Sequence, residues 1–260
     1  MTGAFRQRTV CGVISRDEAL YSELLRAGES IPRLREVLGR LAPDDATLRA
    51  VLRRPVPLRL LEYVAVTAPW ADDPRMHAAV VLNPRTPRPL SQRLVPGLYW
   101  HDQAQVAASM RLDAAVRRRA EVELCERLRE LRLGDRITLA RLATRPLLTL
   151  LLLQAEPRIV GACLTNPRLR EADLMEAVRS PQATLTLLES TAASARWSTS
   201  YALQLALVLQ PRTPLALSLP RLPLLLEVDR KRVADTSTLP PPLTAAALRA
   251  ASENSLESGG

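Results

Sequence analysis

Apolar residues recur along the chain at the spacing of helix faces, and short proline-containing segments interrupt them. Residues 113–133 show the clearest pattern, with apolar side chains on one side and arginines and glutamates at pairing distance on the other. This stretch predicts one long amphipathic helix. Its apolar positions are Val116, Ala120, Leu124, Leu128 and Leu131.

Polar residues that start and end helices divide the N-terminal part of the chain. Ser15 lies three residues before a glutamate, which is the arrangement of a capping box, and Gly28 is the residue type that ends helices. We therefore expect a helix over residues 16–27. Two further helices are expected to begin at the N-cap residues Ser30 and Asp44 or Asp45.

The chain also repeats itself. Residues 68–121 align with residues 195–248 at a constant offset of 127 without a gap, and 18 of the 54 aligned positions are identical. Chance would match a chain of this composition at about 10% of positions. Self-similarity at a long fixed offset is typical of repeat arrays, in which each unit buries its apolar face against its neighbours.

The most regular part of the repeat reads Asn-Pro-Arg-Thr-Pro from Asn83 and Gln-Pro-Arg-Thr-Pro from Gln210. A residue before proline avoids the helical conformation, so a helix is expected to end at each of these residues. The threonines are predicted N-caps, and the prolines after them predicted first residues of the next helix. Each segment is thus a predicted helix–turn–helix corner. The corner positions are Pro84, Thr86 and Pro87, and Pro211, Thr213 and Pro214.

These corners resemble those of the HEAT-like α-solenoids, especially the leucine-rich repeat variant group. Residues 83–87 and 210–214 carry the resemblance, and residues 166–170 carry it more weakly. It implies an all-α, right-handed solenoid of helical pairs that serves as a binding scaffold. Some members hold a cysteine-ligated iron–sulfur cluster, but the three cysteines here are scattered, so we expect no cofactor. We predict an N-terminal helical cap at 1–47, repeats at 48–251 and a disordered tail at 252–260.

The charge of the chain leaves two interpretations open. The net charge is +9, and all 36 basic residues except Lys231 are arginine. A strongly basic chain favours a nucleic-acid or other anionic partner. Such an arginine excess is also typical of GC-rich coding sequences, in which case the arginines form an ordinary solvated surface.

Arginines at the corners are candidate binding residues. Arg85 and Arg212 occupy the same place in the two copies, and Arg168 joins them in the weaker corner. If the corners line one edge, these guanidinium groups form a ladder that binds phosphates or carboxylates. Alternatively, each arginine bonds a carbonyl at the end of a helix.

The aromatic residues give a second set of candidates. Trp70 and Trp197 each lie thirteen residues before a corner, which predicts a shared packing role. Tyr99 and Trp100, next to a histidine, have no aromatic counterpart in the second copy. These two are the candidate partner contacts, with a buried wedge as the alternative.

Other residue patterns argue against catalysis. The two histidines, His77 and His101, lie near no nucleophile elbow, and the chain has no phosphate-binding glycine loop. We therefore expect a non-enzymatic protein without a metal site that binds another protein. Binding of a nucleic-acid backbone through a basic face is the alternative. The longest apolar run, residues 147–153, is too short to span a bilayer, so we expect no membrane insertion and a cytoplasmic location.

Overall fold

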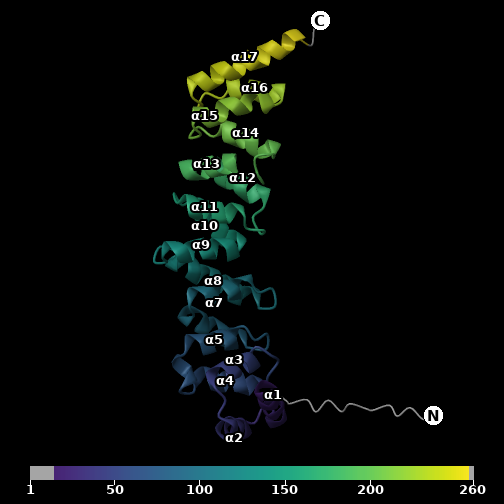
Figure 1. The fold of residues 1–260 in the computed structure, drawn as a ribbon, viewed down its shortest axis with the longest axis vertical. Coiled ribbons are helices and arrows are strands. Elements are labelled where there is room, and N and C mark those ends of the chain that lie inside the picture. Colours follow the sequence, from purple (N-terminus) through teal and green to yellow (C-terminus); the bar gives the residue numbers. More distant parts are fainter. Residues whose placement is uncertain (1–14, 258–260) are drawn as a thin grey trace, which may run out of the picture. The chain divides into compact units, whose positions relative to one another are not determined.

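The computed structural model describes residues 15–257, and all regular elements among them are helices, which confirms the all-α class. The described residues form two compact units that divide between residues 123 and 124. Figure 1 labels their helices. Unit 1 contains α1 Arg16–Ala27, α2 Ile31–Leu41, α3 Asp45–Leu52, α4 Leu58–Val66, η1 Trp70–Asp72, α5 Pro74–Val81, α6 Arg88–Leu94, η2 Val95–Gly97, α7 Trp100–Ala108 and most of α8 Ala114–Arg127. Unit 2 contains α9 Leu133–Leu142, α10 Arg145–Leu152, α11 Pro157–Leu164, α12 Glu171–Arg179, α13 Leu185–Ala193, α14 Tyr201–Leu209, α15 Leu215–Ser218, η3 Leu219–Leu224, α16 Glu227–Ala234 and α17 Pro241–Glu257.

Within each unit, a helix packs against the helix two places further along the chain. In unit 1, α3 contacts α1 and α5, and α2 contacts α4. In unit 2, α11 contacts α9 and α13, while α12 contacts α10 and α14. These contacts place the helices named here in two alternating rows within each unit. The two units do not divide at residue 47, so the boundary of the expected cap stays a prediction.

The helix starts predicted near the N-terminus are confirmed. The hydroxyl of Ser15 accepts a hydrogen bond from the main-chain N–H of Glu18, and Gly28 ends α1 with a φ of 60°. That φ lies in the left-handed region, which glycine adopts without strain. Asp44 caps α3 by accepting from the N–H of Thr47. Short polar residues therefore set the ends of these helices, as expected from their residue types.

The single helix predicted over residues 113–133 is wrong. Helix α8 ends at Arg127 and α9 begins at Leu133. Between them the N–H of Leu128 donates to the carbonyl of Cys125, a three-residue spacing that closes a turn in place of the helix. Leu128 is nevertheless buried, so the apolar pattern runs on through the turn and hides the break.

The internal repeat is visible in the helices. With the offset of 127, α5 and α14 begin at equivalent residues, and so do α6 and α15, α7 and α16, and α8 and α17. Seven of the 18 identical positions are buried in both copies. Examples are the pairs Val81 and Val208, Leu98 and Leu225, Val106 and Val233, and Ala120 and Ala247, all of them buried.

The C-terminal helix is longer than expected. We predicted that the repeats end at residue 251 and that 252–260 form a disordered tail, whereas α17 continues to Glu257. The prediction of disorder is wrong for residues 252–257, because no glycine or proline interrupts the helix before Gly259. Residues 258–260 lie outside the described part.

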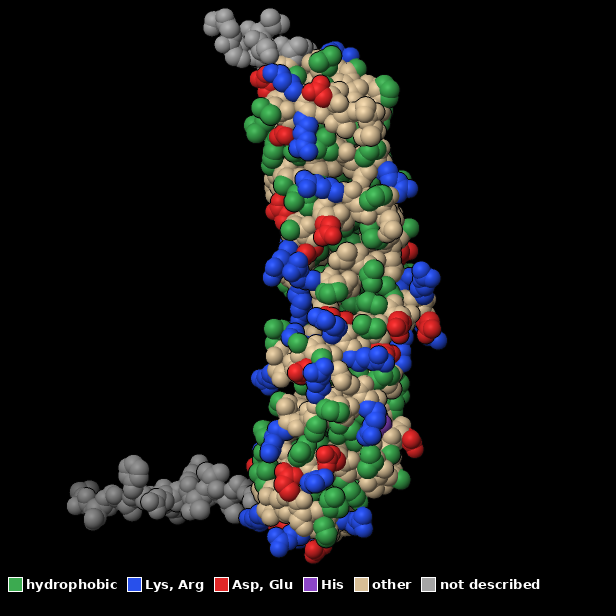
Figure 2. Space-filling model, turned by 180° about the vertical axis from the view of Figure 1, so that it is seen from behind, with side chains coloured by type: hydrophobic (Ala, Val, Ile, Leu, Met, Phe, Trp, Pro, Cys, Tyr) green, Lys and Arg blue, Asp and Glu red, His purple; other side chains and the backbone are tan. Residues whose placement is uncertain are grey.

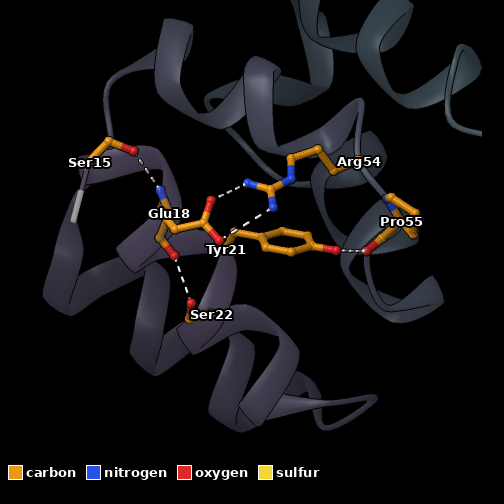
Figure 3. A network of polar contacts seen from close by, with 6 residues as sticks. All are labelled: Ser15, Glu18, Tyr21, Ser22, Arg54 and Pro55. Atoms are coloured by element: carbon orange, nitrogen blue, oxygen red, sulfur yellow. Dashed lines mark hydrogen bonds and ion pairs between the residues drawn. The ribbon is translucent and has the colours of Figure 1, made fainter. Parts of the chain in front are cut away.

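A polar network joins α1 to the end of α3 in unit 1 (Figure 3). The guanidinium of Arg54 pairs with the carboxylate of Glu18 at 2.8 Å and lies 3.6 Å from the ring centroid of Tyr21. The hydroxyl of Tyr21 donates to the carbonyl of Pro55 at 3.0 Å. Hydrogen bonds and a cation–π contact thus hold the segment after α3 against the first helix.

Candidate binding surface

A buried amide holds the first corner in place. Asn83 is 1% exposed and follows the end of α5. Its Nδ2 donates to the carbonyls of Leu52 at 2.6 Å and Arg54 at 2.7 Å, which lie at the end of α3. Its Oδ1 accepts from the N–H of Arg85 at 2.9 Å. The Asn83 side chain therefore shapes its own corner. It also satisfies carbonyls that the C-terminal end of α3 leaves unpaired.

The same arrangement occurs twice in unit 2. Asn166, after α11, donates to the carbonyl of Ala140 at 2.8 Å near the end of α9 and accepts from the N–H of Arg168. Gln210, after α14, donates to the carbonyl of Val178 at 2.6 Å at the end of α12. We call these three side chains the corner amides. The sequence placed Asn83 and Gln210 at helix ends, but their second bond, to a helix about thirty residues earlier, depends on tertiary packing.

The corner threonines do not have their predicted role. Pro87 and Pro214 are the N-cap residues of α6 and α15, so the prolines precede the first helical residue and the threonines lie one place earlier. The hydroxyl of Thr86 instead donates to the carbonyl of Val80 at 2.5 Å. Thr213 is buried, and its hydroxyl has no partner among the described residues. The prediction that these threonines are N-caps is wrong because Pro87 and Pro214 hold the N-cap positions, and the Thr86 hydroxyl bonds the preceding helix instead.

Two of the three corner arginines bond carbonyls, as the structural alternative expects. Arg168 donates to the carbonyl of Leu142 at 2.8 Å, and Arg212 donates to that of Pro181 at 2.9 Å. Arg85 makes no side-chain hydrogen bond among the described residues. It lies near Glu29, whose pKa is lowered mainly by the N–H of Arg59 and further by the charge of Arg85. Two of the three arginines in the proposed ladder therefore already have hydrogen-bond partners within the protein.

Trp197 and Trp70 occupy equivalent places but are buried to different extents. Trp197 is 7% exposed, and its Nε1 donates to the carbonyl of Leu164 at 3.0 Å. The guanidinium of Arg196 covers its ring at 4.3 Å. Trp70 is half-buried and meets the ring of Tyr63 edge-on at a centroid distance of 6.5 Å. The tryptophan of the second copy therefore carries more of the packing.

The segment from Tyr99 to Asp102 forms an aromatic cluster at the start of α7. Tyr99 is the N-cap residue and is 48% exposed, whereas Trp100 is half-buried. The His101 ring stacks on Tyr99 at 6.0 Å and meets Trp100 edge-on at 5.9 Å. Nε2 of His101 lies 3.2 Å from a carboxylate oxygen of Asp102. Tyr99 is thus the candidate that faces solvent.

Asp102 is the buried carboxylate of this cluster. It is 6% exposed, and its Oδ2 has no hydrogen-bond partner in the described part of the chain. Burial raises its pKa, while His101, Arg53 and Arg75 partly oppose the rise. Ionising Asp102 therefore costs more in the folded state than in the unfolded state.

We expect Asp102 to titrate above the ordinary aspartate pKa of about 3.9. Because the folded state binds the proton more tightly, the free energy of unfolding falls as pH rises from the unfolded pKa of about 3.9 through the raised folded value. Relative to Asp102→Asn, the wild type should become less stable over that interval. Carboxyl NMR titration and urea unfolding at several pH values measure this. An Asp102 titration at or below the ordinary aspartate pKa would contradict it.

The second copy exposes aliphatic side chains at the place of the aromatic cluster. Leu224, Leu226 and Val228 are 63%, 64% and 77% exposed, while Leu222 and Leu225 between them are buried in the core of unit 2. Single exposed leucines are common, but three large apolar side chains within five residues form a patch. We call Leu224, Leu226 and Val228 the apolar strip. The positions of Leu226 and Val228 correspond to Tyr99 and His101.

The metal-ligating and nucleophilic side chains of the described residues form no further candidate site. Among residues 15–257, no group of three His, Cys, Asp or Glu side chains is placed to hold a metal ion. Burial raises the pKa of the Cys163 thiol to about 12, which makes it a poor nucleophile, and Cys11 lies outside the described residues. None of the helices described combines the length and apolar character needed to cross a bilayer.

Comparisons with known proteins do not assign the chain to a family. No family model matches it, and neither curated proteins nor solved structures give a significant match.

Proposed function

We propose that this protein is a non-enzymatic scaffold or adaptor that binds another protein in the cytoplasm. In this proposal the helices form a right-handed α-solenoid of HEAT-like repeats, similar to leucine-rich repeat variant proteins without the iron–sulfur cluster. The corner amides and the alternating rows of helices support such an array, because both recur along the chain. The proposal fails if the protein turns over a substrate and a surface point mutation abolishes that activity.

The observation that carries the proposal is exposed bulky side chains at one equivalent place in both copies. Tyr99 lies there in the first copy, and Leu226 and Val228 lie there in the second. Packing of the core does not explain why these bulky side chains lie at the surface. Exposed aromatic and aliphatic clusters are typical of the centres of protein–protein interfaces.

The alternative, binding of a nucleic-acid backbone, has the net charge of +9 in its favour. Against it, Arg168 and Arg212 already bond carbonyls. On the face drawn in Figure 2, basic side chains stand among acidic and hydrophobic ones rather than forming one continuous patch. We therefore place protein binding first.

The double variant Leu226→Glu/Val228→Glu is expected to lose the captured partner and keep its thermal stability, because both side chains are exposed. Tagged wild-type and variant proteins are used to capture partners from native lysate, with and without nuclease, over a salt series. The control Leu150→Glu/Leu185→Glu changes residues that are 45% and 52% exposed on other helices. If the tagged protein instead captures nucleic acid that elutes steeply with salt, and Leu226→Glu/Val228→Glu leaves this capture unchanged, the alternative is favoured.

A further inference from the structure

Three arginines on α6 and α8 of the first copy have no basic counterpart in the second. Arg93, Arg118 and Arg119 are exposed, and the equivalent positions in the second copy hold Pro220, Ala245 and Ala246. The helices of the two copies begin at equivalent residues, so the fold does not need arginine at these places. These three charges are therefore specific to the first copy.

Two neighbouring grooves flank α6 within unit 1. One, of about 610 Å³, lies between α4 and α6. The other, of about 440 Å³, lies between α6 and α8. We call the two together the α6 groove. Its apolar lining consists of Val66, Pro87, Pro89, Leu90, Ala114, Ala115 and Val122. Val66 is 63% and Val122 42% exposed, so apolar surface there is open to solvent.

The charges around the α6 groove are only partly balanced inside the protein. Arg119 pairs with Glu123 at 2.6 Å. Arg93 and Arg118, which line the groove, form no ion pair with any described residue. The only acidic residue in the lining, Glu62, is paired with Arg59 at 3.0 Å. The groove thus combines an apolar floor with unbalanced positive charge.

We propose that the α6 groove binds an acidic, amphipathic segment of a partner protein. Leucine-type side chains of that segment cover the apolar floor, and its carboxylates meet Arg93 and Arg118. This inference rests on the proposed scaffold function and names the chemistry of the bound segment. A nucleic-acid strand fits less well, because its backbone does not cover apolar surface and no aromatic side chain lines the groove for base stacking.

The test measures binding of a defined probe to the full-length chain by fluorescence anisotropy. The probe is a short fluorescein-labelled peptide with leucines on one helical face and glutamates on the other. A second peptide carries lysine in place of each glutamate, and a labelled oligothymidine represents nucleic acid. We expect the glutamate peptide to bind and the lysine peptide to bind at least about tenfold more weakly.

Two variants locate the binding. Arg93→Ala/Arg118→Ala should weaken the glutamate peptide about tenfold, and Val66→Asp should weaken it similarly. The alanine at 118 copies Ala245, so the fold accommodates it. The matched control Arg33→Ala/Arg111→Ala removes two exposed charges elsewhere in unit 1 and should leave the affinity unchanged. Circular dichroism confirms that each variant is folded.

Three results would overturn the inference. They are equal binding of both peptides, equal loss in the control variant, and tighter oligothymidine binding that Arg93→Ala/Arg118→Ala abolishes. If Leu226→Glu/Val228→Glu loses a protein partner while no peptide binds the α6 groove, the scaffold proposal stands and this inference fails. If the glutamate peptide binds the groove but lysate yields no protein partner, the scaffold proposal fails instead.

Discussion

The Trp197→Ala variant is expected to lower the free energy of unfolding by about 3–5 kcal/mol. Trp197 is 7% exposed, so its removal leaves a cavity in the core of unit 2. It also removes the hydrogen bond from Nε1 to the carbonyl of Leu164 and the ring under Arg196. Urea unfolding followed by circular dichroism measures the loss without depending on tryptophan fluorescence.

The equivalent substitution in the first copy provides the control. Trp70 is half-buried, so Trp70→Ala should cost only about 1–2 kcal/mol. Trp197→Phe keeps most of the packing and loses the N–H donor, so it should fall between these values, at about 2 kcal/mol. Equal losses for Trp70→Ala and Trp197→Ala would show that the two tryptophans are not buried as described.

Replacing a corner amide should have the next largest effect. In Asn83→Leu the side-chain volume is nearly kept, but the carbonyls of Leu52 and Arg54 and the N–H of Arg85 lose their partner. Leaving buried polar groups unpaired costs about 1–3 kcal/mol each, so we expect a loss of about 3 kcal/mol in total. Asn166→Leu should behave similarly, because Asn166 is also 1% exposed.

The chain itself suggests the control for this prediction. Gln210 stands at the place of Asn83 in the second copy and makes the same kind of bond. Asn83→Gln should therefore cost less than Asn83→Leu. The melting temperature of each variant by circular dichroism gives the order. Identical losses for glutamine and leucine would mean that the amide bonds do not hold the corner.

Sequence patterns predicted the local features of the fold well. The starts of α1 and α3 follow from single polar residues, and the offset of 127 predicted equivalent helices in the two copies. The break between α8 and α9 was missed because Leu128 keeps its apolar position through the turn. The spacing of apolar residues indicates which side chains are buried, not whether the backbone is helical. A turn that keeps the same side chains buried therefore leaves the apolar pattern unchanged.

The candidate surface was less predictable. The sequence identified Tyr99 as an unshared aromatic residue. The leucines of residues 222–226 look alike in the sequence, whereas the structure buries Leu222 and Leu225 and exposes Leu224 and Leu226. The role of Arg168 and Arg212 depends on which carbonyls lie nearby, which only tertiary packing decides. The α6 groove combines residues from three helices, and no single stretch of sequence contains it.

In the proposed scaffold each corner is held to a helix about thirty residues earlier, and the corner amides provide that link. Hydrogen exchange of side-chain amides, measured by NMR on the full-length protein, tests this most directly. The NH₂ groups of Asn83, Asn166 and Gln210 should be strongly protected, whereas those of the exposed Gln105 and Gln182 should exchange rapidly. Exchange of all five groups at the same fast rate would contradict the structure described for the corners.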